Sequence, residues 1–256
     1  MKYNIRKILT CVLVFVCFAM QSAGALPIFD RNGQVLILTY HKLSELQNEW
    51  SDFCISPKTF EDDIKFLKGR GYTFMTASEL AKADTKGKKT AVITFDDGYE
   101  SDIKYAAPVL EKYNAKATFF IIGGAIGTPD YMSKQQIAEL SKKACAEIGS
   151  HSDKIHFKKY QTLTVMYRSG KYNNEIINDF KKNDEILKEI TGNIPSAVSY
   201  PNGLYSPAID KQLKKDGKII TFSTHEASYG GVKKDAPTGR RNRGCLKNIA
   251  DMARMY

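Results

Sequence analysis

Short apolar runs and helical apolar repeats alternate along most of the chain. The short runs, most of them rich in β-branched and aromatic residues, predict strands at 34–40, 91–93, 117–122, 147–150, 197–200 and 218–222. The repeats predict helices between them: one capped by Ser56, one with Ile103, Ala107 and Leu110 facing inward, 133–144, 173–190, and one capped by Ser206. This alternation favours an α/β fold with a mostly parallel sheet, either open or closed into a barrel.

The first 25 residues have a different pattern, which is typical of a signal peptide. They contain a positive start, an apolar core and a small-residue cleavage site, at Lys2, Arg6 and Lys7, at 8–20 and at 23–25. An apolar run of about 13 residues is too short to cross a bilayer comfortably. We therefore predict a signal peptide at 1–25, a single mature domain at 26–256, and a secreted or extracytoplasmic location in the cell wall or periplasm. An uncleaved membrane anchor is the alternative.

Composition narrows the choice of partners. The net charge of +10 falls to +7 when the three basic residues of the signal are removed (10 − 3). The remaining Lys and Arg are scattered over helices and loops and form no recognisable nucleic-acid module. We therefore expect an anionic cell-wall or envelope surface as a partner, and no nucleic acid. Three cysteines remain after the signal, an odd number without metal-site spacing.

Two adjacent carboxylates, Asp96 and Asp97, end the strand predicted at 91–93 and precede Gly98. In parallel α/β folds, functional sites lie at the carboxyl ends of the strands. Like charges this close repel each other and raise one pKa unless a cation or a hydrogen-bond donor compensates them. The simpler alternative is a structural turn, because Asp-Asp-Gly is also common turn chemistry.

Two of the four histidines, His151 and His156, follow the strand predicted at 147–150. Their separation of five suits a loop that turns both imidazoles inward, whereas ligand pairs on a helix prefer a separation of four. With one carboxylate they form a common ligand set for a catalytic Zn²⁺ or a similar divalent cation, and they leave one coordination position open. The second carboxylate is then left over as a general base, and spacing alone does not say which aspartate has which role.

A third strand-end loop, Tyr200-Pro201-Asn202-Gly203-Leu204-Tyr205, follows the strand predicted at 197–200. Pro-Asn-Gly is ordinary turn chemistry, so a structural turn is again the simpler alternative. The loop is of interest because it is expected to face the same rim of the sheet as the carboxylates and the histidines.

These segments resemble the polysaccharide deacetylases, carbohydrate esterase family four. Thr94-Phe95-Asp96-Asp97-Gly98-Tyr99 is similar to the first motif of the family, and the histidine pair resembles the second motif with one extra residue. That longer spacing, the Tyr-Pro-x-Gly-x-Tyr at 200–205 and Leu38-Thr39-Tyr40-His41 resemble the branch that deacetylates poly-N-acetylglucosamine. The resemblance covers roughly 35–225 and implies an incomplete, distorted (β/α) barrel with a mostly parallel sheet.

The resemblance also implies the chemical roles. Asp96 is expected to be the general base, and Asp97, His151 and His156 are expected to bind one divalent transition metal ion. Zn²⁺ is the expected ion, with Co²⁺, Mn²⁺ or Ni²⁺ as alternatives. The substrate is expected to be a GlcNAc-type polysaccharide.

Further roles fall on the third loop and on the opening motif. The backbone N–H of Asn202 is expected to stabilise an oxyanion, and Tyr200, Pro201 and His41 are expected to contact the substrate. The chain departs from the family here, because Asn202 replaces an aromatic residue and no arginine precedes Pro201. No clear Leu-x-His acid motif is present; His225 is a weaker pocket candidate, and the general acid stays open.

The leading hypothesis is therefore metal-dependent de-N-acetylation of an extracytoplasmic GlcNAc-containing polysaccharide. An O-acetyl esterase acting on xylan or a wall polymer is the nearest alternative, because one site can serve both bonds. A non-catalytic carbohydrate-binding or wall-binding protein is the second alternative, motivated by the missing arginine.

Overall fold

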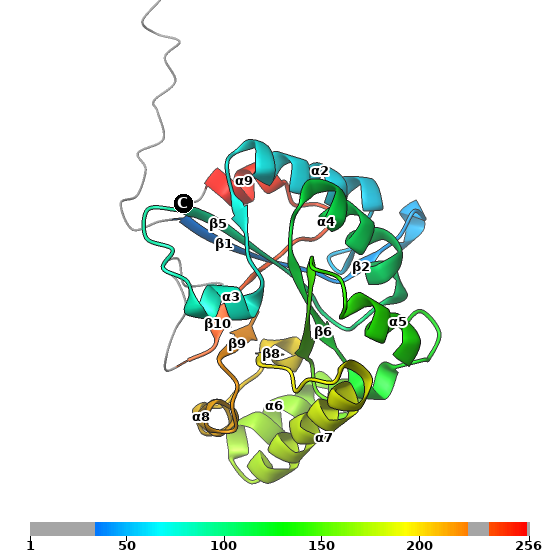
Figure 1. The fold of residues 1–256 in the computed structure, drawn as a ribbon. Coiled ribbons are helices and arrows are strands. Elements are labelled where there is room, and N and C mark those ends of the chain that lie inside the picture. Colours follow the sequence, from blue (N-terminus) through cyan, green and yellow to red (C-terminus); the bar gives the residue numbers. More distant parts are fainter. Residues whose placement is uncertain (1–33, 225–235, 255–256) are drawn as a thin grey trace, which may run out of the picture. The chain divides into compact units, whose positions relative to one another are not determined.

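The centre of the fold is a nine-stranded sheet in which every pairing between the described strands is parallel (Figure 1). The structure, a computed structural model, describes residues 34–224 and 236–254, so the predicted signal peptide and His225 lie outside the described residues. The strand order is β10-β9-β8-β7-β6-β5-β1-β11, and β4 also pairs with β5. The bounds are β1 (Gln34–Tyr40), β4 (Thr73–Phe74), β5 (Lys89–Phe95), β6 (Ala117–Ile121), β7 (Ala146–Ser150), β8 (Ala197–Ser199), β9 (Ile220–Ser223), β10 (Thr238–Gly239) and β11 (Arg241–Asn242). A separate pair consists of β2 (Lys42–Leu43) and β3 (Cys54–Ile55).

The two edges of this sheet meet because β10 and β11 are consecutive in the chain. β10 pairs with β9, β11 pairs with β1, and only Arg240 separates them. Since neighbouring Cα atoms are about 3.8 Å apart, the two outer strands lie within two residues of each other. The sheet is therefore a nearly closed barrel with one break, here called the seam, at Arg240. This confirms the incomplete, distorted (β/α) barrel expected from the resemblance.

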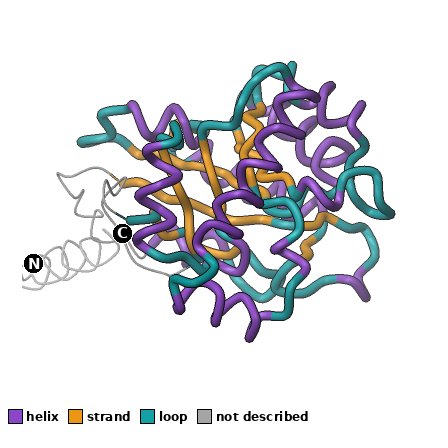
Figure 2. The backbone as a smooth tube through the Cα atoms, turned by 90° about the horizontal axis from the view of Figure 1, so that it is seen from below, coloured by secondary structure: helices purple, strands orange, loops and turns teal. Residues whose placement is uncertain are grey.

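Helices cover the sheet, and Figure 2 shows the strands enclosed among them. They are α2 (Pro57–Gly69), α3 (Ala77–Lys82), α4 (Ala107–Tyr113), α5 (Lys134–Leu140), α6 (Tyr160–Ser169), α7 (Asn173–Thr191), α8 (Pro207–Lys215) and α9 (Ile249–Arg254). Short 3-10 turns occur at Gln47–Glu49, Gly123–Ala125, Ile155–Phe157 and Pro201–Gly203.

Local sequence signals explain where three of these helices begin. Ser56, Ser133 and Ser206 each accept a hydrogen bond from the backbone N–H three residues later, which satisfies an otherwise unpaired donor. The helix predicted to contain Ile103 differs from the expectation, because its first part, Asp102–Ala106, is π-helical. The short elements β2, β3, β4, α3, β10 and β11 were not predicted, since so few residues show no periodicity.

Aromatic side chains pack between the sheet and α2 just beneath the predicted site. The rings of Tyr40 and Phe95 stack with centroids 5.3 Å apart, and Phe95 stacks on Phe119 at 5.2 Å. All three side chains are at most 1% exposed. Because Tyr40 precedes His41 and Phe95 precedes Asp96, this packed column fixes the backbone from which both polar side chains start.

A buried ion pair holds the segment after β11 against the barrel. The backbone N–H of Arg243 donates to the carbonyl of Thr39 at 2.8 Å, and Nε of Arg243 lies 2.7 Å from Oδ2 of Asp63 on α2. Nη2 of Arg243 donates to Oδ1 of the same carboxylate at 3.0 Å, and the Tyr40 hydroxyl donates to Oδ2 at 3.1 Å. Burial raises the pKa of Asp63, and Arg243 offsets this only in part.

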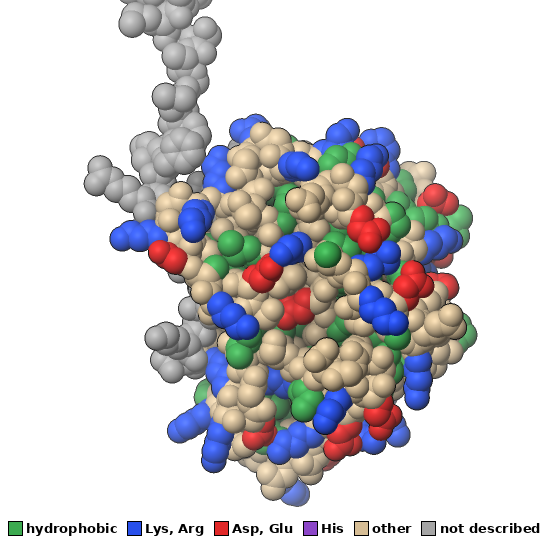
Figure 3. Space-filling model, in the orientation of Figure 1, with side chains coloured by type: hydrophobic (Ala, Val, Ile, Leu, Met, Phe, Trp, Pro, Cys, Tyr) green, Lys and Arg blue, Asp and Glu red, His purple; other side chains and the backbone are tan. Residues whose placement is uncertain are grey.

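Charge on the surface is mixed over the face shown in Figure 3. Lys and Arg side chains lie around the outline, and Asp and Glu side chains lie among them. This distribution forms no single basic patch on that face. Within the described residues, no helix combines the length and the apolar character needed to cross a membrane.

Replacing Arg243 with Met should destabilise the protein by about 3–5 kcal/mol, because it leaves the Asp63 carboxylate buried and unpaired. Denaturant unfolding measures this loss. The double variant Asp63→Asn, Arg243→Met should lose less, because the buried charge is then gone while Tyr40 keeps an acceptor. An equal or greater loss in the double variant would contradict this account of the pair.

Candidate active site

The parallel strands bring the predicted site residues to one rim of the barrel. Asp96 and Asp97 follow β5, His151 follows β7, and Ser199 ends β8; β6 lies between β5 and β7. Asp97 has a φ of 81°, in the left-handed region that residues other than Gly, Asn and Asp seldom adopt. Backbone strain of this kind concentrates at functional sites.

Asp97, His151 and His156 form a compact group of potential metal ligands. Oδ1 of Asp97 lies 3.5 Å from Nε2 of His151 and 3.3 Å from Nε2 of His156, and one ligand atom from each residue lies within 4.8 Å of the others. Ligands about 2.0–2.2 Å from a tetrahedral Zn²⁺ are about 3.3–3.6 Å apart, so these separations fit one ion of that kind.

Hydrogen bonding orients His151 for this role. Its Nδ1 lies 2.7 Å from the carbonyl oxygen of Ser199, so Nδ1 carries a proton and donates, and this contact turns Nε2 toward Asp97. Burial on its own raises the pKa of Asp97, but hydrogen bonds from His151 and His156 bring it well below its usual range. Burial lowers the pKa of His151, and the nearby Asp96 and Asp97 more than offset this and raise it. The lowered pKa of Asp97 and the raised pKa of His151 show that positive charge is favoured between these side chains.

Asp96 lies beside this group and is held by Arg240 from the seam. Nη1 and Nη2 of Arg240 donate to Oδ1 and Oδ2 of Asp96, each at 2.7 Å. The Ser199 hydroxyl donates to Oδ2 at 3.1 Å and accepts from Nη2 at 2.8 Å. Burial would raise the pKa of Asp96, but the charge of Arg240, followed by that of His151, lowers it to about 2. Asp96 is therefore ionised and fixed in orientation.

Arg240 was not predicted from the sequence. No arginine precedes Pro201, and the structure supplies one from a position 144 residues after Asp96. Arg240 is fully buried, and its guanidinium lies over the rings of Phe120 and Phe222 at 5.6 Å and 5.5 Å. In the sequence, the pair Arg240-Arg241 is the one feature that distinguishes this segment, which shows no hydrophobic periodicity.

A second residue that was not predicted, Asp179 on α7, shapes the loop between His151 and His156. Its carboxylate accepts hydrogen bonds from three consecutive backbone N–H groups, those of Asp153, Lys154 and Ile155, at 2.7, 2.9 and 3.1 Å. Without Asp179, these three N–H groups would lack hydrogen-bond acceptors at the start of the 3-10 turn that carries His156. Asp179 thus fixes the loop that the five-residue spacing requires.

The third predicted loop divides into a buried and an exposed part. Tyr200 is fully buried, with its hydroxyl donating to Asp210 at 3.1 Å, and Pro201 is buried as well. Both therefore support the loop from beneath, and neither side chain is placed on the rim. Asn202 is exposed and has a left-handed φ of 53°. The bonds that close the turn run from Gly203 N to Tyr200 O and from Leu204 N to Pro201 O, so neither uses the Asn202 N–H.

His41 comes to the same rim from β1. It follows Tyr40, whose carbonyl accepts a hydrogen bond from the N–H of Asp96 at 3.0 Å. Burial lowers the pKa of His41, while the negative charges of Asp97 and Asp96 act in the opposite direction. Nδ1 of His41 is buried and has no hydrogen-bond partner among the described residues. A third imidazole thus borders the site with free hydrogen-bonding capacity.

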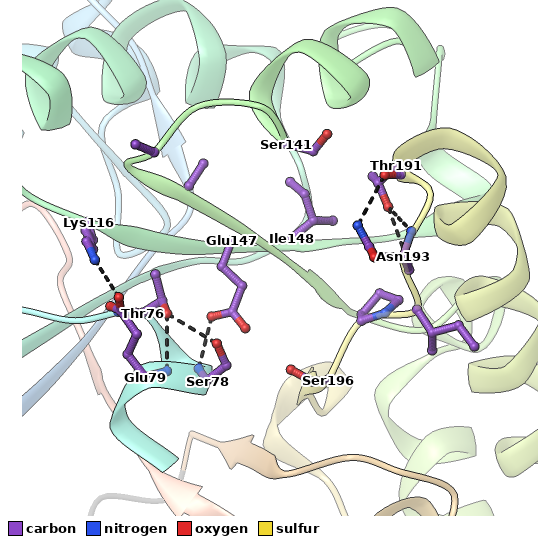
Figure 4. Close-up of a pocket in the computed structure, with 14 residues that line it drawn as sticks. Thr76, Ser78, Glu79, Lys116, Ser141, Glu147, Ile148, Thr191, Asn193 and Ser196 are labelled. Atoms are coloured by element: carbon purple, nitrogen blue, oxygen red, sulfur yellow. Dashed lines mark hydrogen bonds and ion pairs between the residues drawn. The ribbon is translucent and has the colours of Figure 1, made fainter. Parts of the chain in front are cut away.

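A separate polar pocket lies at the amino ends of the strands, away from this site (Figure 4). Residues at the starts of β6, β7 and β8 line it, among them Lys116, Glu147 and Ser196. Glu147 accepts from the backbone N–H of Ser78 at 3.1 Å and from the Thr118 hydroxyl at 2.7 Å. These bonds join α3 to the sheet, so the polar groups here serve the structure of the barrel base.

Comparison with known proteins identifies the family to which the chain belongs. The family model for polysaccharide deacetylases matches residues 83–218, more than half of the chain. The chain belongs to the polysaccharide deacetylase family. This match confirms the resemblance. It includes the segments of Asp96, His151 and Asn202, and it ends before Arg240.

Individual relatives agree with the family assignment. YxkH of Bacillus subtilis (strain 168) is 30% identical over 199 residues, which span 76% of this chain and 66% of YxkH. The poly-beta-1,6-N-acetyl-D-glucosamine N-deacetylase of Staphylococcus aureus (strain N315) is 28% identical over 216 residues, 77% of this chain and 74% of that enzyme. The chain thus spans about two thirds to three quarters of these relatives.

Solved structures support the fold. IcaB from Ammonifex degensii superimposes with a TM-score of 0.73 at 24% identity, covering 87% of this chain and 95% of IcaB. A de-N-acetylase from Aggregatibacter actinomycetemcomitans gives a TM-score of 0.73 at 18% identity, covering 86% and 99%. At these identities the likeness concerns the fold.

Replacing Arg240 with Lys should lower kcat for deacetylation at least about 100-fold, because an ammonium keeps the charge but loses the two-pronged contact with Asp96. Initial rates of acetate release measure this, with Arg168→Lys, at an exposed position on α6, as a control for the same exchange elsewhere. Thermal unfolding must show that the variant is folded. A kcat within twofold of the parent would show that Asp96 does not depend on this geometry.

Replacing Asp179 with Ala should weaken Zn²⁺ binding roughly 10- to 100-fold, because the loop that carries His156 loses its three acceptor contacts. Competition with a chromophoric chelator measures the affinity without requiring turnover. Asp179→Asn, which retains one acceptor oxygen, should lie between the parent and the Ala variant. Glu185→Ala, at an exposed position on the same helix, is the matched control. Unchanged affinity in Asp179→Ala would show that the loop holds its shape without this carboxylate.

Proposed function

We propose that this protein is an extracytoplasmic, metal-dependent deacetylase that removes N-acetyl groups from a GlcNAc-containing polysaccharide. The observation that carries the proposal is the juxtaposition of two differently held carboxylates: Asp97 faces two histidines, and Asp96 faces a buried arginine. The name of the staphylococcal relative, a poly-beta-1,6-N-acetyl-D-glucosamine N-deacetylase, supports the choice of polymer and of bond.

The metal is proposed to be held by Asp97, His151 and His156. Two imidazole nitrogens and a carboxylate oxygen are borderline ligands that suit Zn²⁺, and Co²⁺, Mn²⁺ or Ni²⁺ bind similar sets. A bound ion of this class supplies Lewis acidity to the attacking water and the acetyl carbonyl. The Ser199 carbonyl maintains the histidine tautomer on which this binding depends.

Asp96 is proposed to be the general base. It accepts a proton from the water that attacks the acetyl carbon, and the proton then passes to the amine nitrogen as the C–N bond breaks. The products are acetate and a free amino sugar. Arg240 keeps Asp96 ionised and aimed, which is the task that an arginine before Pro201 would have had. The missing arginine motivated the non-catalytic alternative, and Arg240 removes that reason.

Two rim groups complete the proposed site. The backbone N–H of Asn202, which the turn leaves free of its two closing bonds, is proposed to donate to the developing oxyanion. His41 is proposed to contact the substrate through its partly exposed imidazole, which lies close to Asp96 and Asp97.

The sequence supports the proposed location and the proposed partner surface. The signal-like segment at 1–25 supports an extracytoplasmic protein in the wall or periplasm, and the charge of +7 after its removal supports attraction to anionic envelope polymers.

Acetate release from N-acetylglucosamine oligomers tests the proposed function. We expect release that stops with a chelator and returns with Zn²⁺. Asp96→Asn should bind the metal normally and lose turnover about 1,000-fold, whereas Asp97→Asn should lose metal and turnover together. Metal content is measured by elemental analysis of each purified variant.

Two results would overturn the proposal. Release from acetylated xylan without release from any N-acetyl oligomer would make the protein an O-acetyl esterase. Absence of release on both substrate classes, in protein shown to contain its metal, would favour a carbohydrate-binding protein.

A further inference from the structure

Two exposed phenylalanine rings border the candidate site, each next to one of its histidines. Phe53 is 61% exposed, and its ring meets that of His41 edge-on, with centroids 5.0 Å apart. Phe157 is 57% exposed, and its ring meets that of His156 edge-on at 6.0 Å. Each ring thus combines exposure to solvent with direct contact to a histidine of the candidate site.

Backbone hydrogen bonds hold the segment around Phe53 in place. It lies in a tight turn closed by two backbone hydrogen bonds between Ser51 and Cys54, of 2.9 and 3.4 Å. Its carbonyl accepts from the backbone N–H of Lys42 at 3.0 Å, which places it beside His41. The side-chain amide of Asn242, in β11, donates to the Asp52 carbonyl at 2.7 Å. The turn is thus fixed to both β2 and the seam, although the ring itself packs little.

The segment around Phe157 is held in place by comparable contacts. It ends the 3-10 turn that follows the three backbone contacts of Asp179, and its N–H donates to the carbonyl of Lys154 at 3.2 Å. Its ring rests on Gly124, where an added Cβ would come within 3.2 Å of Cε2. The glycine therefore leaves space for the ring to lie flat against the rim.

The two rings stand on different sides of the reacting carboxylates. His41 and Phe53 belong to the β1 side, whereas Phe157 belongs to the β7 side, and β5 with Asp96 lies between β1 and β6 in the sheet. Three strand-to-strand steps separate β1 from β7, on the order of 10–14 Å along the curved rim. A chain of sugar rings that crosses the site would meet one phenylalanine on each side.

We propose that Phe53 and Phe157 are stacking surfaces for the sugar rings on either side of the residue that loses its acetyl group. This inference rests on the proposed function and extends it. A pyranose ring presents C–H groups on its faces, and an uncharged aromatic ring packs on them while the hydroxyl edges stay in water. Two such surfaces favour acetyl groups on internal residues of the polymer over those at its ends.

The dependence of rate on oligomer length tests the proposal. In the parent, kcat/KM should rise from the N-acetylglucosamine monomer to the pentamer. In Phe53→Ala and in Phe157→Ala, the ratio of the pentamer value to the monomer value should fall roughly five- to tenfold, and more in the double variant. The loss should appear mainly in KM, because stacking holds ground state and transition state alike.

Matched controls separate this effect from others. Ile194 is also 57% exposed but lines the pocket at the opposite ends of the strands, so Ile194→Ala should leave the ratio unchanged. Phe53→Leu and Phe157→Leu, which keep apolar bulk without a ring face, should resemble the Ala variants.

An unchanged ratio in both Ala variants would overturn the proposal. Equal losses on monomer and pentamer would also overturn it, because the rings would then act only by supporting His41 and His156. Inactivity of the parent on every oligomer would instead refute the proposed function.

Discussion

Two negative charges at the end of a buried strand are the constraint on which the site depends. Asp96 and Asp97 are 2% and 9% exposed, and carboxylates at that depth stay ionised only where positive charge or donors surround them. Arg240 compensates Asp96, and His151 with His156 compensates Asp97. Because Arg240 comes from the seam, the charge of Asp96 is compensated only after the barrel has closed.

Much of the fold and part of the site could be predicted because their signals are local. The cap at Ser56, the apolar run at 34–40 and the adjacency of Asp96 and Asp97 are each contained in a few neighbouring residues. A general rule then placed the carboxylates and the histidines at one rim, since parallel strands end on the same side. The motifs added the family, which the comparison with known proteins confirmed.

The residues that escaped prediction act over long separations. Arg240 lies between two strands of two residues each, which are too short for any periodicity, and it comes 144 positions after its partner Asp96. Asp179 looked like a polar position on an amphipathic helix, and only the folded structure reveals the three amides that it faces. Tyr200 was expected on the rim, but β8 ends at Ser199 and the Tyr200 ring turns away from the rim toward α8. There Asp210 accepts a hydrogen bond from its hydroxyl.

The seam has a consequence for the biogenesis of the enzyme. Arg240 is the last of the site residues to be synthesised, so a growing chain can contain Asp97, His151 and His156, the proposed metal ligands, before Asp96 has its partner. Until 238–242 inserts, the edges of β9 and β1 have no neighbour there, and unpaired edges are templates for aggregation. One short segment thus completes the chemistry and protects the sheet in the same step. Proteolytic loss of that segment would remove the partner of Asp96 while leaving Asp97, His151 and His156 in place.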